Sequence, residues 1–266
     1  MNFVSATGND HREEMKQGET RKSAVRRKWS ILVFVIGAAI GMALVGVSVY
    51  ADFESSLFDI AVVSEGTIRP IYCPVFLDVA ETGQVSATFS NHTDEIVDEM
   101  LVRAHISKGH LIWMREVENR LELAPGEKQR LFWDVTAEDA AYNHLILAKV
   151  IVMGSQSEPK DKGSCGVVVL DLPGKINGAQ FFWVLFSVAI IFMLWGAWLW
   201  WPFGRAYSGR RLEATRSIVG LSILITIGLI CSATGLWELA AVSFYISVLM
   251  IGVVVPHFLN TRGSDN

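Results

Sequence analysis

Histidine and cysteine are the side chains of this 266-residue chain best suited to metal binding or nucleophilic chemistry, with six and three copies. His105 and His110 are close in sequence, but a Lys108-Gly109 turn separates them, and no two histidines have the i, i+4 spacing of a zinc hydrolase helix. The acidic stretch 94–99 lacks the fixed spacing of a calcium loop. No Gly-x-Ser-x-Gly elbow or Walker-type phosphate loop occurs. The sequence therefore predicts no catalytic, cofactor-binding or metal-binding residue and no cofactor.

The cysteines predict one disulfide. Cys73 and Cys165 both lie in the long segment between the first two apolar runs, whereas Cys231 lies inside a later run. A pair in an oxidising compartment favours a disulfide. It would close a loop of about 93 residues, worth up to roughly 4–5 kcal/mol in the chain-entropy model. Free thiols or metal ligands are the alternative, which the absence of a Cys-x-x-Cys pattern disfavours.

Four apolar runs predict four transmembrane helices. They occupy residues 31–50, 181–201, 217–237 and 239–258, and none contains Asp, Glu, Lys or Arg. About 20 residues cross the roughly 30 Å of hydrocarbon at about 1.5 Å per residue. In lipid, a helix is the structure that satisfies the backbone within one segment.

The charges predict the orientation of these helices. Lys and Arg gather before the first run, between the second and third, and after the fourth. Because cytoplasmic loops are enriched in these residues, both termini are expected in the cytoplasm and residues 51–178 outside the plasma membrane. Segment 51–178 carries net −9 and the remainder +5, an asymmetry that fits a membrane protein better than a nucleic-acid binder.

Residues 51–178 are expected to form a domain of β-strands. Seven or eight short strands separated by turns are expected, of which Gln129–Val135 is the clearest. There Leu131, Trp133 and Val135 would face inward, with Arg130, Phe132 and Asp134 on the other face. The predicted fold class is therefore a membrane protein of α+β type, with an extracytoplasmic immunoglobulin-like β-sandwich inserted between helices 1 and 2. Other expected strands are 57–63, 71–79, 85–89, 100–107, 111–117, 145–152 and 167–172.

The remaining segments are polar. Residues 1–30 have no apolar periodicity and are expected to be disordered, 202–216 would form a basic cytoplasmic loop, and 259–266 a cytoplasmic tail. A cleaved signal peptide over 31–51 is the alternative to an anchor, since small residues precede Asp52. Asn91-His92-Thr93 fits a glycosylation sequon but also a turn, which is the favoured interpretation.

Small residues recur in the apolar runs. Gly37 and Gly41 are four residues apart in the first run, and Gly228 and Gly235 lie in the third. Such residues let helix backbones approach closely in lipid, although glycine is also simply common in spans. We interpret these four as helix-packing positions, within the chain or in a homo-oligomer.

The sequence favours a non-enzymatic binding or scaffold module. The absence of charged residues inside the runs disfavours a transporter or proton relay. The expected partners are the lipid bilayer and a protein or polymer of the cell envelope, with no nucleic acid. An accessory subunit of a membrane transporter or electron-transfer complex is the alternative, and an envelope enzyme with an unrecognised site is a weaker one.

Overall fold

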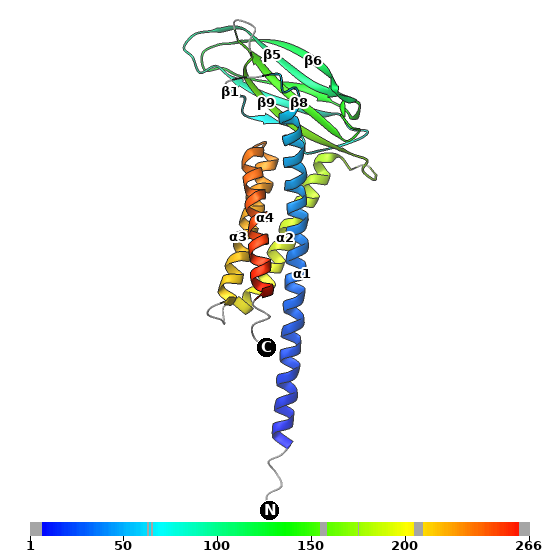
Figure 1. Cartoon of the computed structure of the whole chain (residues 1–266), viewed down its shortest axis with the longest axis vertical. Coiled ribbons are helices and arrows are strands. Elements are labelled where there is room, and N and C mark those ends of the chain that lie inside the picture. Colours follow the sequence, from blue (N-terminus) through cyan, green and yellow to red (C-terminus); the bar gives the residue numbers. More distant parts are fainter. Residues whose placement is uncertain are drawn as a thin grey trace, which may run out of the picture.

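The computed structural model (Figure 1) describes residues 7–62, 64, 66–154, 159–174, 176–204 and 210–260. It has a mixed α+β structure, as predicted, in which two β-sheets lie at one end of a group of long helices. The described strands all fall between the first and second helices along the chain. The helices are α1 (Thr7–Leu57), α2 (Gly178–Gly204), α3 (Arg210–Ala233) and α4 (Trp237–Asn260).

Three of these helices are long and apolar enough to cross a membrane. The qualifying segments are Lys28–Leu57 of α1, Gly178–Leu199 of α2 and Arg216–Ala233 of α3, while the apolar part of α4, Trp237–Val253, is shorter. The segment in α1 has 30 residues, about 45 Å of helix, which exceeds the roughly 30 Å of hydrocarbon. Helix α1 is therefore long enough to reach the sheets after a crossing.

Helix α1 begins much earlier than predicted. It starts at Thr7 and includes most of the segment 1–30 that was expected to be disordered; residues 1–6 lie outside the described part. Glu, Met, Lys, Arg and Ala, which dominate this segment, are good helix formers. Once the apolar run is helical, each added residue gains a hydrogen bond without a new nucleation step. A polar flank can thus be helical without an amphipathic face of its own.

The basic loop and tail were also misassigned in part. Helix α2 continues to Gly204 and α3 begins at Arg210, so most of 202–216 is helical, while 205–209 lie outside the described residues. Helix α4 ends at Asn260, and the rest of the predicted tail, 261–266, is likewise not described.

The described strands form two sheets. Sheet A has the order β1-β9-β8-β5-β6, with β3 also paired to β9, and sheet B has the order β2-β4-β7. Strands β1 and β3 run parallel to β9, and the other pairs are antiparallel. The bounds are β1 Gly66–Thr67, β2 Ile71–Tyr72, β3 Phe76–Asp78, β4 Gly83–Ser90, β5 Val97–Lys108, β6 His110–Leu123, β7 Lys128–Val135, β8 Leu145–Met153 and β9 Pro159–Leu170.

The two sheets share one apolar core. Trp133 and Val135 of β7 are buried in it together with Ile106 of β5 and Val150 of β8, and Leu131 packs against it. Arg130, Phe132 and Asp134, which alternate with these residues on β7, are exposed. The alternation predicted for 129–135 is therefore confirmed, because the period of two in the sequence matches a strand with one buried face.

Strand β8 is buried on both faces. Its sequence, Leu145–Met153, is apolar throughout except for Lys149. The inward residues join the core between the sheets, and Leu145 and Leu147 pack outward with Ala51 and Phe58 at the end of α1. The last turns of α1 thus cover the outer face of β8, and Figure 1 shows the top of the long helix reaching sheet A beside β8. A continuous apolar strand is typical of a sheet covered on both sides.

The strand predicted over 57–63 is wrong. Helix α1 ends at Leu57, and turns follow it. The apolar residues that suggested a strand belong instead to a helix end whose Phe58 side chain is 3% exposed. Covering β8 requires α1 to continue to this point.

The sheets meet the helices at two further places. The Phe76 ring of β3 lies edge-on to Phe181 of α2, with ring centroids 5.5 Å apart. The turn between α3 and α4 lies beside the start of sheet B, where Arg69 forms an ion pair with Glu238. Contacts with α1, α2 and the α3–α4 turn therefore fix the sheets on the helices.

Candidate functional site

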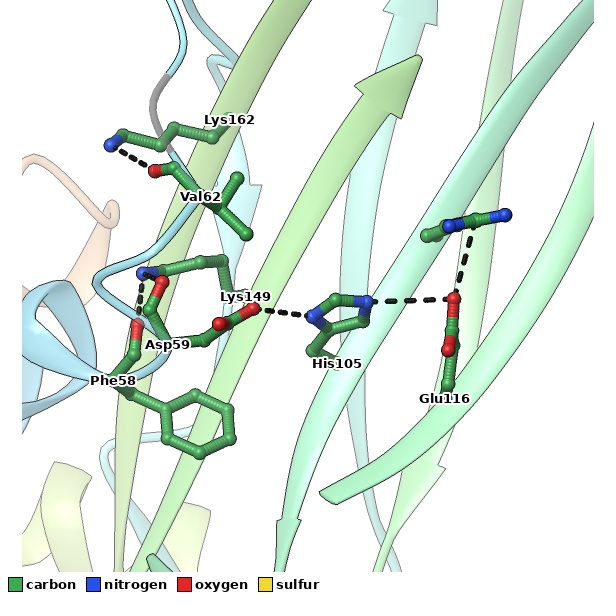
Figure 2. A network of polar contacts seen from close by, with 8 residues as sticks. Phe58, Asp59, Val62, His105, Glu116, Lys149 and Lys162 are labelled. Carbon is green, nitrogen blue, oxygen red and sulfur yellow. Dashed lines mark hydrogen bonds and ion pairs between the residues drawn. The ribbon is translucent and has the colours of Figure 1, made fainter. Parts of the chain in front are cut away.

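A polar network lies where α1 ends against sheet A (Figure 2). We name it the α1 junction: Asp59, Arg103, His105, Glu116 and Lys149. Asp59 follows the helix, Arg103 and His105 lie on β5, Glu116 on β6 and Lys149 on β8. In the paired register His105 faces Glu116 on one side and Lys149 on the other. The junction therefore joins three neighbouring strands to the helix end.

Lys149 binds the end of α1. Its ammonium donates hydrogen bonds to the carbonyl oxygens of Phe58 and of Asp59, the latter at 3.0 Å. The last carbonyls of a helix have no partner within the helix, and a cation is favoured near a helix C-terminus. Lys149 is only 1% exposed. Burial lowers the pKa of Lys149, an effect that the nearby Asp59 carboxylate partly opposes.

Asp59 and His105 form the centre of the junction. Asp59 adopts a φ of +47°, and its Oδ2 lies 2.7 Å from His105 Nδ1, with both side chains nearly buried. On the other side of the ring, Glu116 Oε1 is 3.6 Å from His105 Nε2 and 3.2 Å from Arg103 Nε. The imidazole thus sits between two carboxylates, one of which also faces a guanidinium.

The geometry of the α1 junction indicates a structural role. Within the described part of the chain, His105 Nε2 has no hydrogen-bond partner, so no hydroxyl or thiol is bonded there as a nucleophile would be. Nor do the described residues contain three or more His, Cys, Asp or Glu side chains grouped as a metal site. His110 does not join His105, because its ring lies against Trp113, with centroids 5.9 Å apart. The arrangement ties the helix end to the sheet.

A second polar and aromatic surface lies on the outside of sheet B. Tyr72 of β2 and Phe132 of β7 are both register partners of Ser86 on β4, so the three residues form one row across the sheet. The Tyr72 and Phe132 side chains are 46% and 56% exposed, whereas Ser86 is buried. We name this surface the sheet B face: Tyr72, Gln84, Ser86, Thr88, Arg130, Phe132 and Asp134.

Arg130 is held in place on the sheet B face. Its Nε and Nη2 donate to Ser86 Oγ at 3.1 and 2.7 Å, and its guanidinium carbon lies 5.3 Å from the centroid of the Phe132 ring. One register step away, Gln84 Nε2 donates to Asp134 Oδ1 at 2.9 Å. Two exposed aromatic rings, a fixed guanidinium and an amide–carboxylate pair therefore lie on one open face. Such a surface can bind a ligand without catalysing a reaction.

The predicted disulfide between Cys73 and Cys165 is present, with 6.1 Å between the Cα atoms, and Cys231 is a buried free thiol. The bond joins the segment after β2 to β9. Asn91 is 3% exposed, and its amide nitrogen donates to the carbonyl oxygens of Glu95 and Leu123. These bonds confirm the turn interpretation of the sequon.

Three of the four predicted packing glycines lie between helices. A Cβ at Gly37 would meet the backbone of α2 at Ala189 and Met193, and one at Gly41 would meet Ile225 of α3. A Cβ at Gly228 of α3 would lie 3.2–3.3 Å from Val45 of α1 and Ser243 of α4. These positions thus pack helices within the chain.

Gly235 is not a helix-packing residue. It lies in the turn after α3, which ends at Ala233, and has a φ of +74°. A Cβ there would stand 2.5 Å from the carbonyl oxygen of Ile71 on β2. Glycine is needed because of this left-handed conformation and close approach, which end the helix earlier than the apolar run predicts.

The α1 junction and the sheet B face were both missed as sites by sequence reasoning. Lys149 was detectable, as the one charged residue in a nine-residue apolar run. The pairing of Asp59 with His105 gave no signal, since 46 residues separate them. The row of Tyr72 and Phe132 could not be read from the sequence either, because only the pairing register of β2, β4 and β7 brings the two residues together.

Comparisons with known proteins identify no family. No family model and no curated protein matches the chain. Among solved structures, similarity is found to a Paenibacillus cycloisomaltooligosaccharide glucanotransferase (13% identity, TM-score 0.31, 39% of this chain and 14% of that one). It is also found to the CARDB domain of PF1109 from Pyrococcus furiosus (15% identity, TM-score 0.29, 37% and 87%). A Listeria innocua β-glucosidase is 20% identical (TM-score 0.26, 38% and 15%). Similarity at these scores carries no argument about function.

Proposed function

We propose that this chain is a multi-pass plasma-membrane protein whose extracytoplasmic domain, an immunoglobulin-like β-sandwich, binds or scaffolds another component of the cell envelope. The observation that carries the proposal is the contrast between the two sheets. Helix α1 covers the outer face of sheet A at β8, and the edge strand β6 exposes a single tryptophan, Trp113, while the sheet B face presents the Tyr72 and Phe132 rings exposed in one row. Exposed Tyr, Phe and Arg side chains on a rigid support are typical of binding surfaces.

Three attachments support a scaffold rather than a mobile domain. The α1 junction, the Phe76–Phe181 contact and the Arg69–Glu238 ion pair join the sheets to different helices. Holding a binding face in a fixed orientation lowers the entropy lost on association. A domain held in this way would present the sheet B face at a constant angle to the membrane.

The proposed topology rests on the charges and the disulfide. With α1 to α4 all crossing, the basic N-terminal part of α1 and the basic segment around 205–216 lie on one side, which is the cytoplasm by the positive-inside rule. The Cys73–Cys165 bond then falls in an oxidising compartment. Both termini would be cytoplasmic.

The accessory-subunit alternative has less support. Gly37, Gly41 and Gly228 face other helices of the same chain. An assembly through the helices would therefore have to use other surfaces, such as the exposed Leu194 side of α2.

Site-specific photo-crosslinking in intact membranes separates these functions. A photoreactive phenylalanine analogue would replace Phe132 on the sheet B face, Leu194 on α2 or Glu122 on β6, all of which are exposed. The proposal expects a stoichiometric adduct from position 132 and none from 122. An adduct from 194 alone would support the accessory subunit, and no adduct at any position would contradict both functions.

A further inference from the structure

We propose that the sheet B face binds an anionic glycan, a saccharide chain bearing carboxylate, sulfate or phosphate groups. The inference rests on the proposed binding function and specifies its ligand. Four features of the face lead to this chemistry: the spacing of the rings, the short Ser86 side chain between them, the fixed guanidinium and the paired backbone of β4.

The row Tyr72–Ser86–Phe132 suits a chain of sugar rings. Neighbouring strands lie about 4.8 Å apart, so the two aromatic residues stand about 10 Å apart, with Ser86 between them on β4 and the Arg130 guanidinium bonded to the Ser86 hydroxyl. A pyranose ring has an apolar C–H face, which packs on aromatic rings, and a rim of hydroxyl groups. Gln84, Thr88 and Asp134 supply donors and acceptors for that rim in the neighbouring register positions.

The charge of the face selects an anionic ligand. Segment 51–178 as a whole carries net −9, yet the sheet B face carries the Arg130 cation, and Lys128 precedes it at the start of β7. The one carboxylate there, on Asp134, is bonded to Gln84. Because Ser86 and Phe132 hold Arg130, its remaining N–H groups are already oriented to bind an oxyanion.

The backbone of β4, at the centre of the face, is not free to pair with a peptide. An extended peptide binds a sheet by pairing with a free edge. Strand β4 is paired on both sides at Ser86 and Ala87, and the Asp134 carbonyl oxygen at the β7 edge accepts a hydrogen bond from Arg115 Nη2 at 2.7 Å. A saccharide needs only side-chain contacts, which are what this face provides.

Binding of defined oligosaccharides to the full chain in lipid nanodiscs tests the inference. Nanodiscs avoid maltoside detergents, whose sugar head groups would compete. The probes are hexasaccharides of galacturonic acid, a sulfated glycosaminoglycan and a phosphorylated mannan, with neutral maltohexaose and hexaglutamate as comparisons. At least one anionic hexasaccharide should bind, and more tightly than either comparison.

Variants place the binding on the sheet B face. The affinity for the anionic probe should fall by about tenfold or more in each of three variants, Arg130→Gln, Phe132→Ala and Tyr72→Ala. Tenfold corresponds to the loss of about 1.4 kcal/mol of binding free energy. Gln129→Ala, an exposed neighbour on β7, and Lys160→Gln, an exposed cation on β9, should leave the affinity unchanged. An unchanged thermal unfolding temperature in nanodiscs shows that each variant is folded.

Three results would overturn the inference: no anionic probe binds, hexaglutamate binds equally well, or the three face variants bind like the controls. Capture of a protein from position 132 without any glycan binding would leave the scaffold function standing and refute the glycan. Absence of both protein capture from position 132 and glycan binding would refute the scaffold function and the glycan ligand together.

Discussion

The buried ammonium of Lys149 donates a hydrogen bond to the carbonyl oxygen of Phe58, the first residue after α1. Because Lys149 lies in the middle of strand β8, this bond joins the end of a helix long enough to cross a membrane to the centre of sheet A. The neighbouring pair of Asp59 and His105 extends the connection to β5. The position of the β-domain on α1 therefore depends on a few buried polar contacts.

Replacing Lys149 by Met should destabilise the α1 junction. The Met side chain keeps the apolar stem but leaves the Phe58 and Asp59 carbonyl oxygens without their donor, at a cost of about 1–3 kcal/mol. Thermal unfolding should occur at lower temperature, and protease should cleave after residue 58 faster. Lys160→Met is the control, because Lys160 is exposed on β9; equal behaviour of the two variants would refute the role of Lys149.

The disulfide should protect two of the three cysteines from alkylation. In denatured, unreduced protein a maleimide reagent should add once, at Cys231, and after reduction three times. The double variant Cys73→Ala/Cys165→Ala should lose about 2–5 kcal/mol of unfolding free energy, because the unfolded chain is no longer constrained. Three additions without a reductant would contradict the bond and the oxidising compartment.

Gly37→Ala should weaken the packing of α1 on α2. The new Cβ would stand 2.7 Å from Met193 N and 2.9 Å from Ala189 O, both backbone atoms that cannot rotate away. Such overpacking costs about 1–3 kcal/mol, which heating the detergent-solubilised protein before size exclusion should reveal. Gly252→Ala is the matched control, since nothing lies within 4 Å of a Cβ there. An equal loss of heat stability in the two variants would show that reduced helix flexibility, and not the contact with α2, is responsible.

Acid should loosen the connection between β9 and α2 through Asp78. Hydrogen bonds from the backbone N–H groups of Leu172 and Ala80 lower the pKa of Asp78 below 3.8. Since the unfolded chain binds the proton more readily, the carboxylate stabilises the fold above about pH 3.8, and this contribution disappears as the pH falls through the lowered pKa. The protection factor of the Leu172 amide, which corrects its exchange rate for the intrinsic pH dependence, should fall from pH 5 to pH 3, and Asp78→Asn should flatten that change. An unaltered profile in the variant would assign the effect to other carboxylates.

The sequence by itself determined the features that depend on local composition. Charge-free apolar runs of about 20 residues predict membrane-spanning helices because they match the thickness of the hydrocarbon core, and three of the four are long and apolar enough in the described structure. The alternation over 129–135 gave the inward face of β7 correctly, since a strand with one buried face has a period of two. The cysteine pair predicted the disulfide because only two cysteines lie outside the apolar runs.

Tertiary structure alone decided the rest. The polar segment from Thr7 is helical because it continues a helix nucleated elsewhere, and Gly235 ends α3 because β2 approaches it. The pairing of Asp59 with His105 and the row of Tyr72, Ser86 and Phe132 come from strand register. A local pattern reports whether a residue is buried or exposed, but not which distant segment it meets. For that reason the helices and strand faces were predictable, whereas both candidate sites were not.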